Sequence, residues 1–235
     1  MKGSSIIMLL VFYLSCTAQS DKISFGIQYK PIIPSSYFNS SDLENKFSQY
    51  TFKLNPKYSN SYGMFIRQKI TKIFYTEFGI NYAARNFELN IQNDVFNIKD
   101  VTYFKIRSYE LPLQLLTYIR IAELWYLNTS FGISHNILAS DIYSNGEGNS
   151  NYLQNTYRKN GGYQALLTNI GIEYRTNKSG DYYLGMSLHR PWAPIAKTYP
   201  VFKIDGINND ADLENSKIDI PGNFLTFDLR YFFPE

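Results

Sequence analysis

Residues Tyr109–Tyr118 read YELPLQLLTY, and this stretch decides how the rest of the sequence is interpreted. Leucines occupy every second position from Leu111 to Leu115, and Glu110, just before them, belongs to the alternate set of positions. Successive side chains of a β-strand point to opposite faces, so the alternation predicts a strand with one apolar face and one face that carries a carboxylate. The fold depends on which solvent each face meets.

The composition favours β-structure throughout the chain. Aromatic residues make up 17% of the 235 residues, with 21 Tyr and 17 Phe, and aromatic side chains are enriched in strands. The formal charge of +3 comes without a basic run, so nothing in the charge pattern predicts nucleic-acid binding. No internal repeat or linker divides the chain, which indicates one domain.

The first residues differ from the rest and predict export. Lys2 precedes an apolar stretch at 6–14, and small residues at Cys16 and Ala18 occupy the −3 and −1 positions of a cleavage site before Gln19. This arrangement predicts a signal peptide at 1–18 and a mature domain at 19–235, because the apolar stretch is too short to span a membrane as a helix.

Cys16 is the only cysteine and leaves two alternatives open. If the chain is cleaved after Ala18, the mature protein contains no cysteine and therefore no disulfide. If Cys16 is instead acylated, the chain is a lipoprotein. In the first case an exported chain must be held together by something other than disulfides.

Eight segments show the same alternation of apolar and polar residues. They are separated in turn by long polar connections and tight turns, which predicts antiparallel neighbours in an up-and-down order. The expected strands are 23–30, 62–70, 74–85, 102–118, 125–133, 166–175, 182–189 and 225–233. The expected polar connections are 31–60, 86–100, a third that contains 141–162, and 191–222.

One face of every expected strand is apolar and the other is polar. A soluble barrel would enclose the apolar faces, because burial of apolar surface drives closure. A barrel in an outer membrane reverses this arrangement, with apolar faces toward lipid and polar faces inside, and its closure leaves no unpaired backbone edge in hydrocarbon. The polar faces carry Lys30, Arg67, Lys69, Glu77, Arg85, Glu110, Glu173, Arg175, His189, Asp228 and Arg230.

The membrane alternative agrees with three further features: the signal peptide, the strict alternation of long and short connections, and aromatic residues at strand ends where interface girdles lie. These aromatic residues are Tyr62, Tyr82, Tyr103, Tyr118, Trp125, Tyr174, Tyr182, Tyr231 and Phe233. We therefore predict an all-β fold, an eight-stranded antiparallel up-and-down transmembrane β-barrel, in the outer membrane with both termini in the periplasm.

In such a barrel the enclosed charges form a lumen charge network. An unpaired charge in a narrow barrel costs several kcal/mol, so the inward acids are expected to pair with the inward Lys and Arg side chains, with His189 beside them. Eight strands enclose little more than their own side chains, so no open pore is expected. Pro112 cannot donate a ladder hydrogen bond, which predicts a local bulge.

The sequence resembles a known family. Residues 107–118, RSYELPLQLLTY, followed by WYLNTSFGI at 125–133, resemble two consecutive strand motifs of the PorT-like outer-membrane β-barrel proteins of Bacteroidota. GIEY at 171–174 and FDLRYF at 227–232 are similar to later strands of that family. The glycine usual before the core of the fifth strand is replaced here by Thr129-Ser130.

The resemblance covers most of the mature chain and implies an eight-stranded barrel in an outer membrane. It implies no single activity, because one member supports type IX secretion and gliding while others are surface proteins. A role in an envelope complex, with type IX secretion as its narrower form, is thus an expectation from the family.

The chain has two histidines, His135 and His189, which could serve a hydrolase that modifies lipids or peptides at the barrel rim. Ser134 and His135 are adjacent on one strand and therefore point to opposite faces. The loop acids show no EF-hand spacing, and no phosphate loop or HExxH motif is present. We expect a non-enzymatic protein without metal or cofactor; a rim hydrolase and a soluble periplasmic binding barrel are the alternatives.

The long connections are rich in aromatic residues, which are frequent in binding hot spots but can equally pack the loops against one another. The expected partners are outer-membrane lipid and envelope proteins, with no nucleic acid. The candidate partner-binding residues are Tyr37, Phe38, Tyr143, Tyr157, Trp192 and Phe202.

Overall fold

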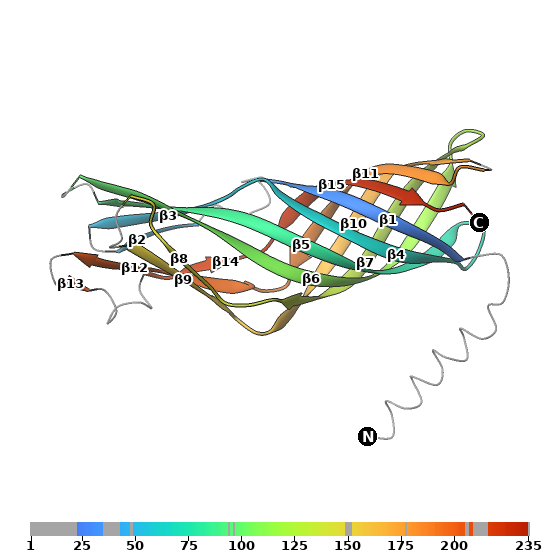
Figure 1. Cartoon of the computed structure of the whole chain (residues 1–235). Helices are drawn as coiled ribbons and strands as arrows, with labels where there is room; N and C mark the ends of the chain where they lie inside the picture. Colours follow the sequence, from blue (N-terminus) through green and yellow to red (C-terminus); the bar gives the residue numbers. More distant parts are fainter. Residues whose placement is uncertain are drawn as a thin grey trace, which may run out of the picture.

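The computed structural model (Figure 1) describes residues 23–34, 43–47, 49–93, 95, 97–148, 152–176, 178–204, 207–208 and 216–234, with side chains undescribed at 98, 202–204 and 207–208. The expected signal peptide at 1–18, the loop candidates Tyr37 and Phe38, and the side chain of Phe202 therefore lie outside what is described. None of the described segments forms a helix long and apolar enough to cross a membrane.

Eight antiparallel strands form a closed ring in the order β5-β4-β1-β15-β11-β10-β7-β6, and pairing of β6 with β5 closes it. This confirms the predicted all-β, eight-stranded up-and-down barrel. The strands are β1 (Ile23–Ile33), β4 (Ser59–Lys69), β5 (Phe74–Asn93), β6 (Ile98–Arg120), β7 (Trp125–Leu138), β10 (Gly162–Arg175), β11 (Asp181–Pro191) and β15 (Phe224–Phe232).

One end of the barrel, the turn end, holds the short connections. The chain termini of the ring, β1 and β15, pair antiparallel from Gly26–Phe232 to Ile33–Leu225. The tight turns β4–β5, β6–β7 and β10–β11 lie at the same end (Figure 1). At the β4–β5 turn the Thr71 hydroxyl accepts hydrogen bonds from two backbone N–H groups. In the β10–β11 turn Gly180 has a φ of 80°, which favours glycine.

Beyond the other end of the ring, strands β5 and β6 continue into a second, distal half. There they join β2 (Glu44–Phe47) and β3 (Tyr50–Pro56) in one sheet. A second sheet faces it, built from β8 (Ile142–Asn145), β9 (Tyr152–Arg158), β12 (Ala196–Ile204), β13 (Ile207–Asn208) and β14 (Ile218–Ile220). The two halves lie end to end along one axis (Figure 1).

The distal half encloses an apolar core. Phe52, Leu89 and Ile91 from the first sheet and Ile220 from the second are almost fully buried in it. Each such side chain contributes about 1.5–3 kcal/mol relative to an exposed position. The distal half therefore resembles an ordinary water-soluble β-sandwich, in which the apolar faces of the two sheets point inward.

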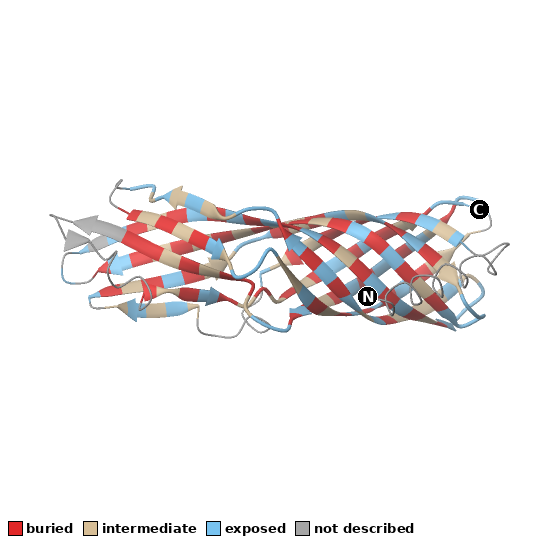
Figure 2. Cartoon of the chain, turned by 90° about the horizontal axis from the view of Figure 1, so that it is seen from below, coloured by how far each residue is buried: buried red, intermediate tan, exposed pale blue. Residues whose placement is uncertain are grey.

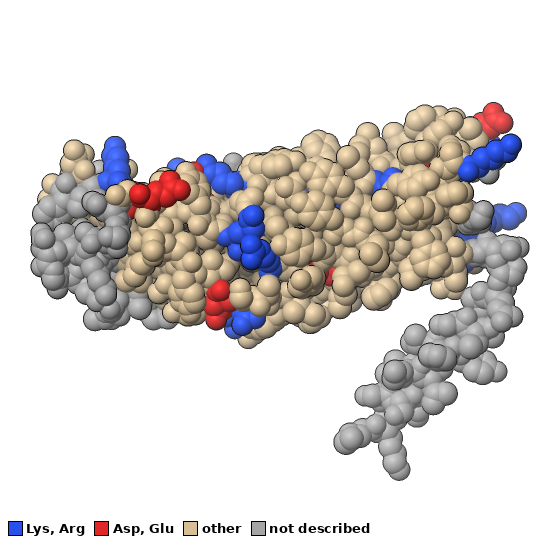
Figure 3. All heavy atoms as spheres, viewed as in Figure 1, with Lys and Arg blue, Asp and Glu red and all other residues tan. Residues whose placement is uncertain are grey.

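The eight-stranded ring, called the membrane half from here on, has the opposite arrangement. The outward side chains of β6 show where the arrangement changes. Its outward side chains are charged at Lys105 and Arg107 and become apolar from Tyr109 to Ile119, apart from Thr117. At a strand tilt of ~40°, this eleven-residue stretch spans about 25 Å along the axis, the height of a lipid-facing belt. Figure 2 shows the resulting checkerboard of buried and exposed positions, and Figure 3 shows a side surface of this half almost free of charge.

Two aromatic girdles border the belt. At the distal border Tyr29, Tyr62, Tyr82 and Tyr109 form a row on adjacent strands, with ring centroids 5.6, 6.4 and 5.7 Å apart. At the turn end two pairs of rings contact each other, Trp125 with Tyr174 and Tyr182 with Tyr231. Amphipathic rings prefer the membrane–water interface, so both borders of the belt are marked.

The prediction that the long segments between ring strands are polar connections is wrong, because these segments build the distal half. Segments 31–60, 86–100, 141–162 and 191–222 contain strands rather than loops alone. Their sequence also alternates, but the apolar residues, such as Phe87 and Leu89, lie on the face that is polar in the membrane half. The alternation continues in phase along the strand, and only the polarity of its two faces is exchanged.

Two smaller predictions are wrong. Pro112 causes no bulge: β6 keeps one register with β5 from Phe74 to Asn93, and only the pairings opposite Gly79 and Ile80 are missing. Tyr118 belongs to the lumen, where it is buried, rather than to a girdle, and Tyr103 lies beyond the girdle on the distal half. Tyr118 has the inward parity of its strand, which outweighs its place near the strand end.

The belt predicts opposite responses at two positions on one face of β6. Leu113 is 53% exposed in the belt, and Tyr103 is 49% exposed on the distal half. Leu113→Arg should lower the free energy of unfolding in lipid vesicles by about 2–4 kcal/mol, because it places a cation in hydrocarbon. Tyr103→Arg should change it by less than ~0.5 kcal/mol. Urea titration measures both; equal effects would mean that the belt does not face lipid.

Candidate functional site

The interior of the membrane half is filled by a network of ion pairs built around Arg230. Its guanidinium donates to Glu77 Oε1 at 2.9 Å and to Asp228 Oδ2 at 3.0 Å. Lys30 Nζ lies 3.4 Å from the same Asp228 oxygen. The four side chains come from β1, β5 and β15, and all are nearly inaccessible to solvent. Each buried charge thus has an opposite charge in contact, as a low-dielectric interior requires.

A second cluster lies toward the turn end, around Glu173. Its carboxylate accepts hydrogen bonds from Arg67 Nη1 at 2.6 Å, from Arg175 Nε at 2.7 Å and from the Tyr118 hydroxyl at 2.9 Å. Arg67 also lies over the Phe232 ring, 3.4 Å from its centroid. Aromatic and ionic contacts together fix Arg67 across the lumen.

A third cluster lies where the membrane half meets the distal half. Glu110 accepts a hydrogen bond from Asn81 Nδ2 at 2.8 Å, and His189 Nε2 lies 3.4 Å from its other oxygen. The His189 ring stacks on Phe224 with centroids 4.2 Å apart. Arg85 donates to the carbonyl oxygen of Gly222 at 2.8 Å. Gly222 in turn lies next to Ile195 of the apolar core, so the polar network and the core adjoin here.

The structure places the predicted lumen residues on the inner face of the ring. Lys69 and Arg175 are half-buried near the turn end. The others are buried: Lys30, Arg67, Glu77, Arg85, Glu110, Glu173, His189, Asp228 and Arg230.

Neutral and peripheral members of the network were missed by the sequence analysis. Asp228 also accepts hydrogen bonds from Asn169, Thr226 and Ser187, and the Tyr183 hydroxyl donates to Asn169. Each of these residues shares the strand parity of a charged lumen residue. Parity alone would have identified them.

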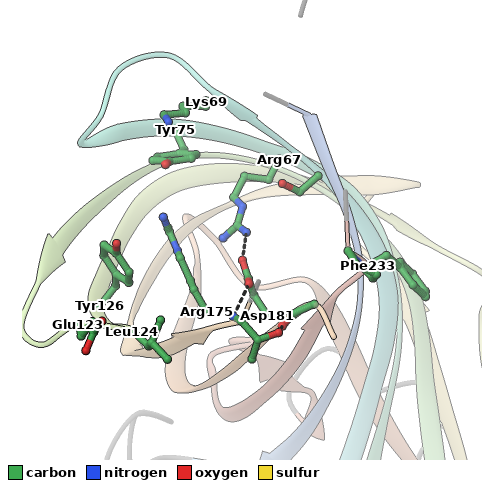
Figure 4. A pocket seen from close by; sticks show the side chains of 13 residues that line it. Arg67, Lys69, Tyr75, Glu123, Leu124, Tyr126, Arg175, Asp181 and Phe233 are labelled. Carbon is green, nitrogen blue, oxygen red and sulfur yellow. Dashed lines mark hydrogen bonds and ion pairs between the residues drawn. The ribbon is translucent and has the colours of Figure 1, made fainter. Parts of the chain in front are cut away.

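The turn end opens into a vestibule of about 440 Å³ (Figure 4). Its walls include Lys69, Tyr75, Tyr126 and Arg175, and its floor is closed by Arg67. Asp181, which the sequence analysis did not single out, lies 3.6 Å from Arg67 Nη2. The vestibule therefore ends on the ion pairs of the lumen.

Within the described ranges, neither candidate catalytic histidine forms a hydrogen bond with a serine or threonine hydroxyl. Ser134 is buried on the inner face and His135 is exposed on the outer face of β7. The ring of His135 lies 3.4 Å from Gln164 Nε2. His189 was considered at the rim, but it is enclosed between Phe224 and Tyr163. Among the described residues no group of three or more metal-ligating side chains gathers.

The loop candidates fall on different surfaces. Tyr143 and Tyr157 lie together on the outer face of the second distal sheet, with ring centroids 6.0 Å apart, and Tyr199 extends the row at 5.7 Å. The side chains of Tyr143 and Tyr157 are 64% and 40% exposed. Trp192 is exposed after β11, apart from this tyrosine row. Other loop aromatics, such as Phe52, pack into the distal core.

The Glu173 cluster predicts a large effect of one neutral substitution. Glu173→Gln should lower the free energy of unfolding in detergent micelles by about 3–5 kcal/mol, because it leaves the buried Arg67 and the half-buried Arg175 without their shared counter-charge. The matched control is Glu44→Gln, whose partner Lys46 lies 3.8 Å away on the surface; the effect there should stay below ~1 kcal/mol. Equal effects would mean that water screens the Glu173 cluster.

Comparison with known proteins identifies solved structures with a similar fold. No protein-family model matches the sequence, and no curated protein is significantly similar to it. Among solved structures the chain is similar to the outer membrane protein OprG from Pseudomonas aeruginosa, with a TM-score of 0.55 and 10% identity over 93% of this chain and 99% of that one.

A second solved structure is the translocator domain of the autotransporter NalP from Neisseria meningitidis. It has 8% identity, and the match covers 99% of this chain and 95% of that one. The TM-score is only 0.36, which does not indicate a shared fold. The likeness to OprG concerns fold alone at this identity. The chain has the fold of an outer-membrane β-barrel.

Proposed function

We propose that the protein is an integral outer-membrane barrel that conducts no solutes and anchors its rigid distal half at the cell surface as a subunit of an envelope complex. The observation that carries this proposal is the filled lumen. Arg230 and Arg67 cross it within ion-pair distance of acids on other strands, and the apolar core of the distal half lies directly beyond it.

The membrane location rests on the belt and its two girdles. A soluble barrel would expose Leu113, Phe131 and Leu229 to water while burying Glu77 and Arg230, which reverses the driving force for folding in water. With the turn end toward the periplasm, both ring termini lie on the side from which the chain arrives. The distal half then projects outward.

The rigidity of the distal half supports a scaffolding role. Strands β5 and β6 pair in one unbroken register from the turn end to the distal tip, apart from the two positions near Pro112. A surface on the distal half is thereby held at a fixed height and orientation relative to the membrane. An enzyme is a weaker proposal, because neither histidine forms a hydrogen bond with a serine hydroxyl in the described part of the chain.

The tyrosine row of Tyr143, Tyr157 and Tyr199 is the proposed partner contact. Exposed aromatic rings on a hydrogen-bonded sheet resemble the anchors of protein interfaces. Membership of the PorT-like barrels and a part in type IX secretion are narrower forms of this proposal, supported by the sequence resemblance at 107–133.

The filled lumen predicts that the protein conducts no ions. Reconstituted in a planar bilayer, the folded protein should produce no single-channel openings, because ions would have to displace the pairs of Arg67 and Arg230. A 16-stranded porin in the same bilayer is the positive control, and heat-modifiable gel mobility of the same sample verifies the folded barrel. Steady openings of a folded sample would refute the anchor model.

The tyrosine row predicts position-specific contacts in cells. A photo-crosslinking amino acid at Tyr143 or Tyr157 should give the same crosslinked partner from both positions. The control is Lys53, which is exposed on the opposite distal sheet and should give none. Crosslinks from Lys53 alone, or from no position, would remove the tyrosine row as the partner contact.

A further inference from the structure

Charge returns to the outer face of β6 immediately beyond the distal girdle. Arg107 and Lys105 are the first and second outward residues after Tyr109, and both are exposed. Figure 3 shows Lys and Arg side chains gathered where the uncharged belt ends. Their position on the lipid-facing side of the strand places them at headgroup height if the belt lies in the hydrocarbon.

The acids on the neighbouring strands already have cationic partners. Glu88 on β5 contacts Lys57 Nζ at 2.5 Å, and this hydrogen bond lowers the pKa of Glu88. Asp141, beyond the end of β7, accepts hydrogen bonds from the Arg158 backbone N–H at 2.9 Å and from its Nε at 3.1 Å, and the backbone bond lowers the pKa of Asp141.

Among the described residues, no carboxylate is therefore left to pair with Arg107 and Lys105. Within the described part of the chain neither side chain forms an ion pair or a side-chain hydrogen bond. The residue opposite Arg107 on β5 is Ala84, whose small side chain leaves the guanidinium accessible from outside. Below it, the Tyr82 and Tyr109 rings lie 5.7 Å apart and can contact the upper part of an acyl chain.

We propose that Arg107 and Lys105 bind the phosphate groups of anionic lipid headgroups in the leaflet next to the distal half. A guanidinium binds phosphate through two parallel hydrogen bonds, and an ammonium adds a point charge. The two residues are separated by about 7 Å along the strand, so they can contact one bisphosphorylated headgroup or two neighbouring ones. This inference rests on the proposed membrane location.

The test uses the full-length protein in nanodiscs of phosphatidylcholine with 10% of a phosphorylated anionic lipid, lipid A. Native mass spectrometry measures how much lipid A stays bound after delipidation. The amount of lipid A that stays bound to the double variant R107Q/K105Q should be at least about tenfold lower than the amount bound to the unaltered protein. The reason is that each cation near an anionic surface contributes roughly fivefold to binding.

The matched control is Lys99→Gln. Lys99 is exposed on the same face of β6 but lies ~20 Å from Lys105 and ~26 Å from Arg107 along the strand, beyond the reach of headgroups. It should retain lipid A as the unaltered protein does. A loss as large as that of R107Q/K105Q, or no loss in R107Q/K105Q, would overturn the proposal.

Two further arms separate the sources of failure. Inorganic phosphate at millimolar concentration should not displace the bound lipid; full displacement would assign the site to free phosphate and overturn the lipid assignment. Heat-modifiable mobility in the same nanodiscs reports insertion. An inserted barrel that binds no lipid A refutes this inference alone, whereas a failure to insert refutes the membrane location as well.

Discussion

The structure depends on closure of the ring by backbone hydrogen bonds. Eight strands pair in sequence, and the β5–β6 ladder removes the two edges that an open sheet would leave. In hydrocarbon every unpaired N–H or C=O group costs several kcal/mol, so a sheet that faces lipid must close. Closure fixes the diameter, and the diameter of eight strands fixes how little space remains inside.

That narrow space explains why the lumen is highly charged and why most of its charges lie in ion pairs. A ring with apolar residues outside must place its polar residues inside, and most of them are beyond the reach of water. Asp228 illustrates the solution, with two cations and three neutral donors around one carboxylate. Gly171 and Gly185, paired across β10 and β11, leave room for the Tyr183 ring in the same layer.

Much of the membrane half could be predicted from the sequence, because strand parity and the polarity of each face agree there. Glu110, Arg67 and Arg230 were assigned to the lumen on parity alone, and the structure buries all three. The distal half could not be predicted from the same rule. Phe52, Phe87 and Ile106 alternate with polar residues, but here the apolar side chains have the inward parity. This pattern fits the fold only if the outer face of the distal half meets water and not lipid.

Other differences arise from competition between local and global constraints. Pro112 suggested a bulge, but neighbours on both sides hold β6 in register, so the missing donor costs two pairings and not a change of register. Asp181 was overlooked because it follows a hairpin turn, where acids are common for local reasons. Its contact with Arg67 depends on the curvature of the closed ring, which a linear pattern does not contain.

The pairing of β1 with β15 has a consequence for assembly. The first and last strands of the ring are about 200 residues apart in the chain, and contacts at such separation make folding slow. The ring cannot close before β15 is present, because β15 joins β1 to β11. Until then the polar edges of β1 and β11 stay unpaired, and the rate of closure depends on whatever holds the unclosed chain in the meantime.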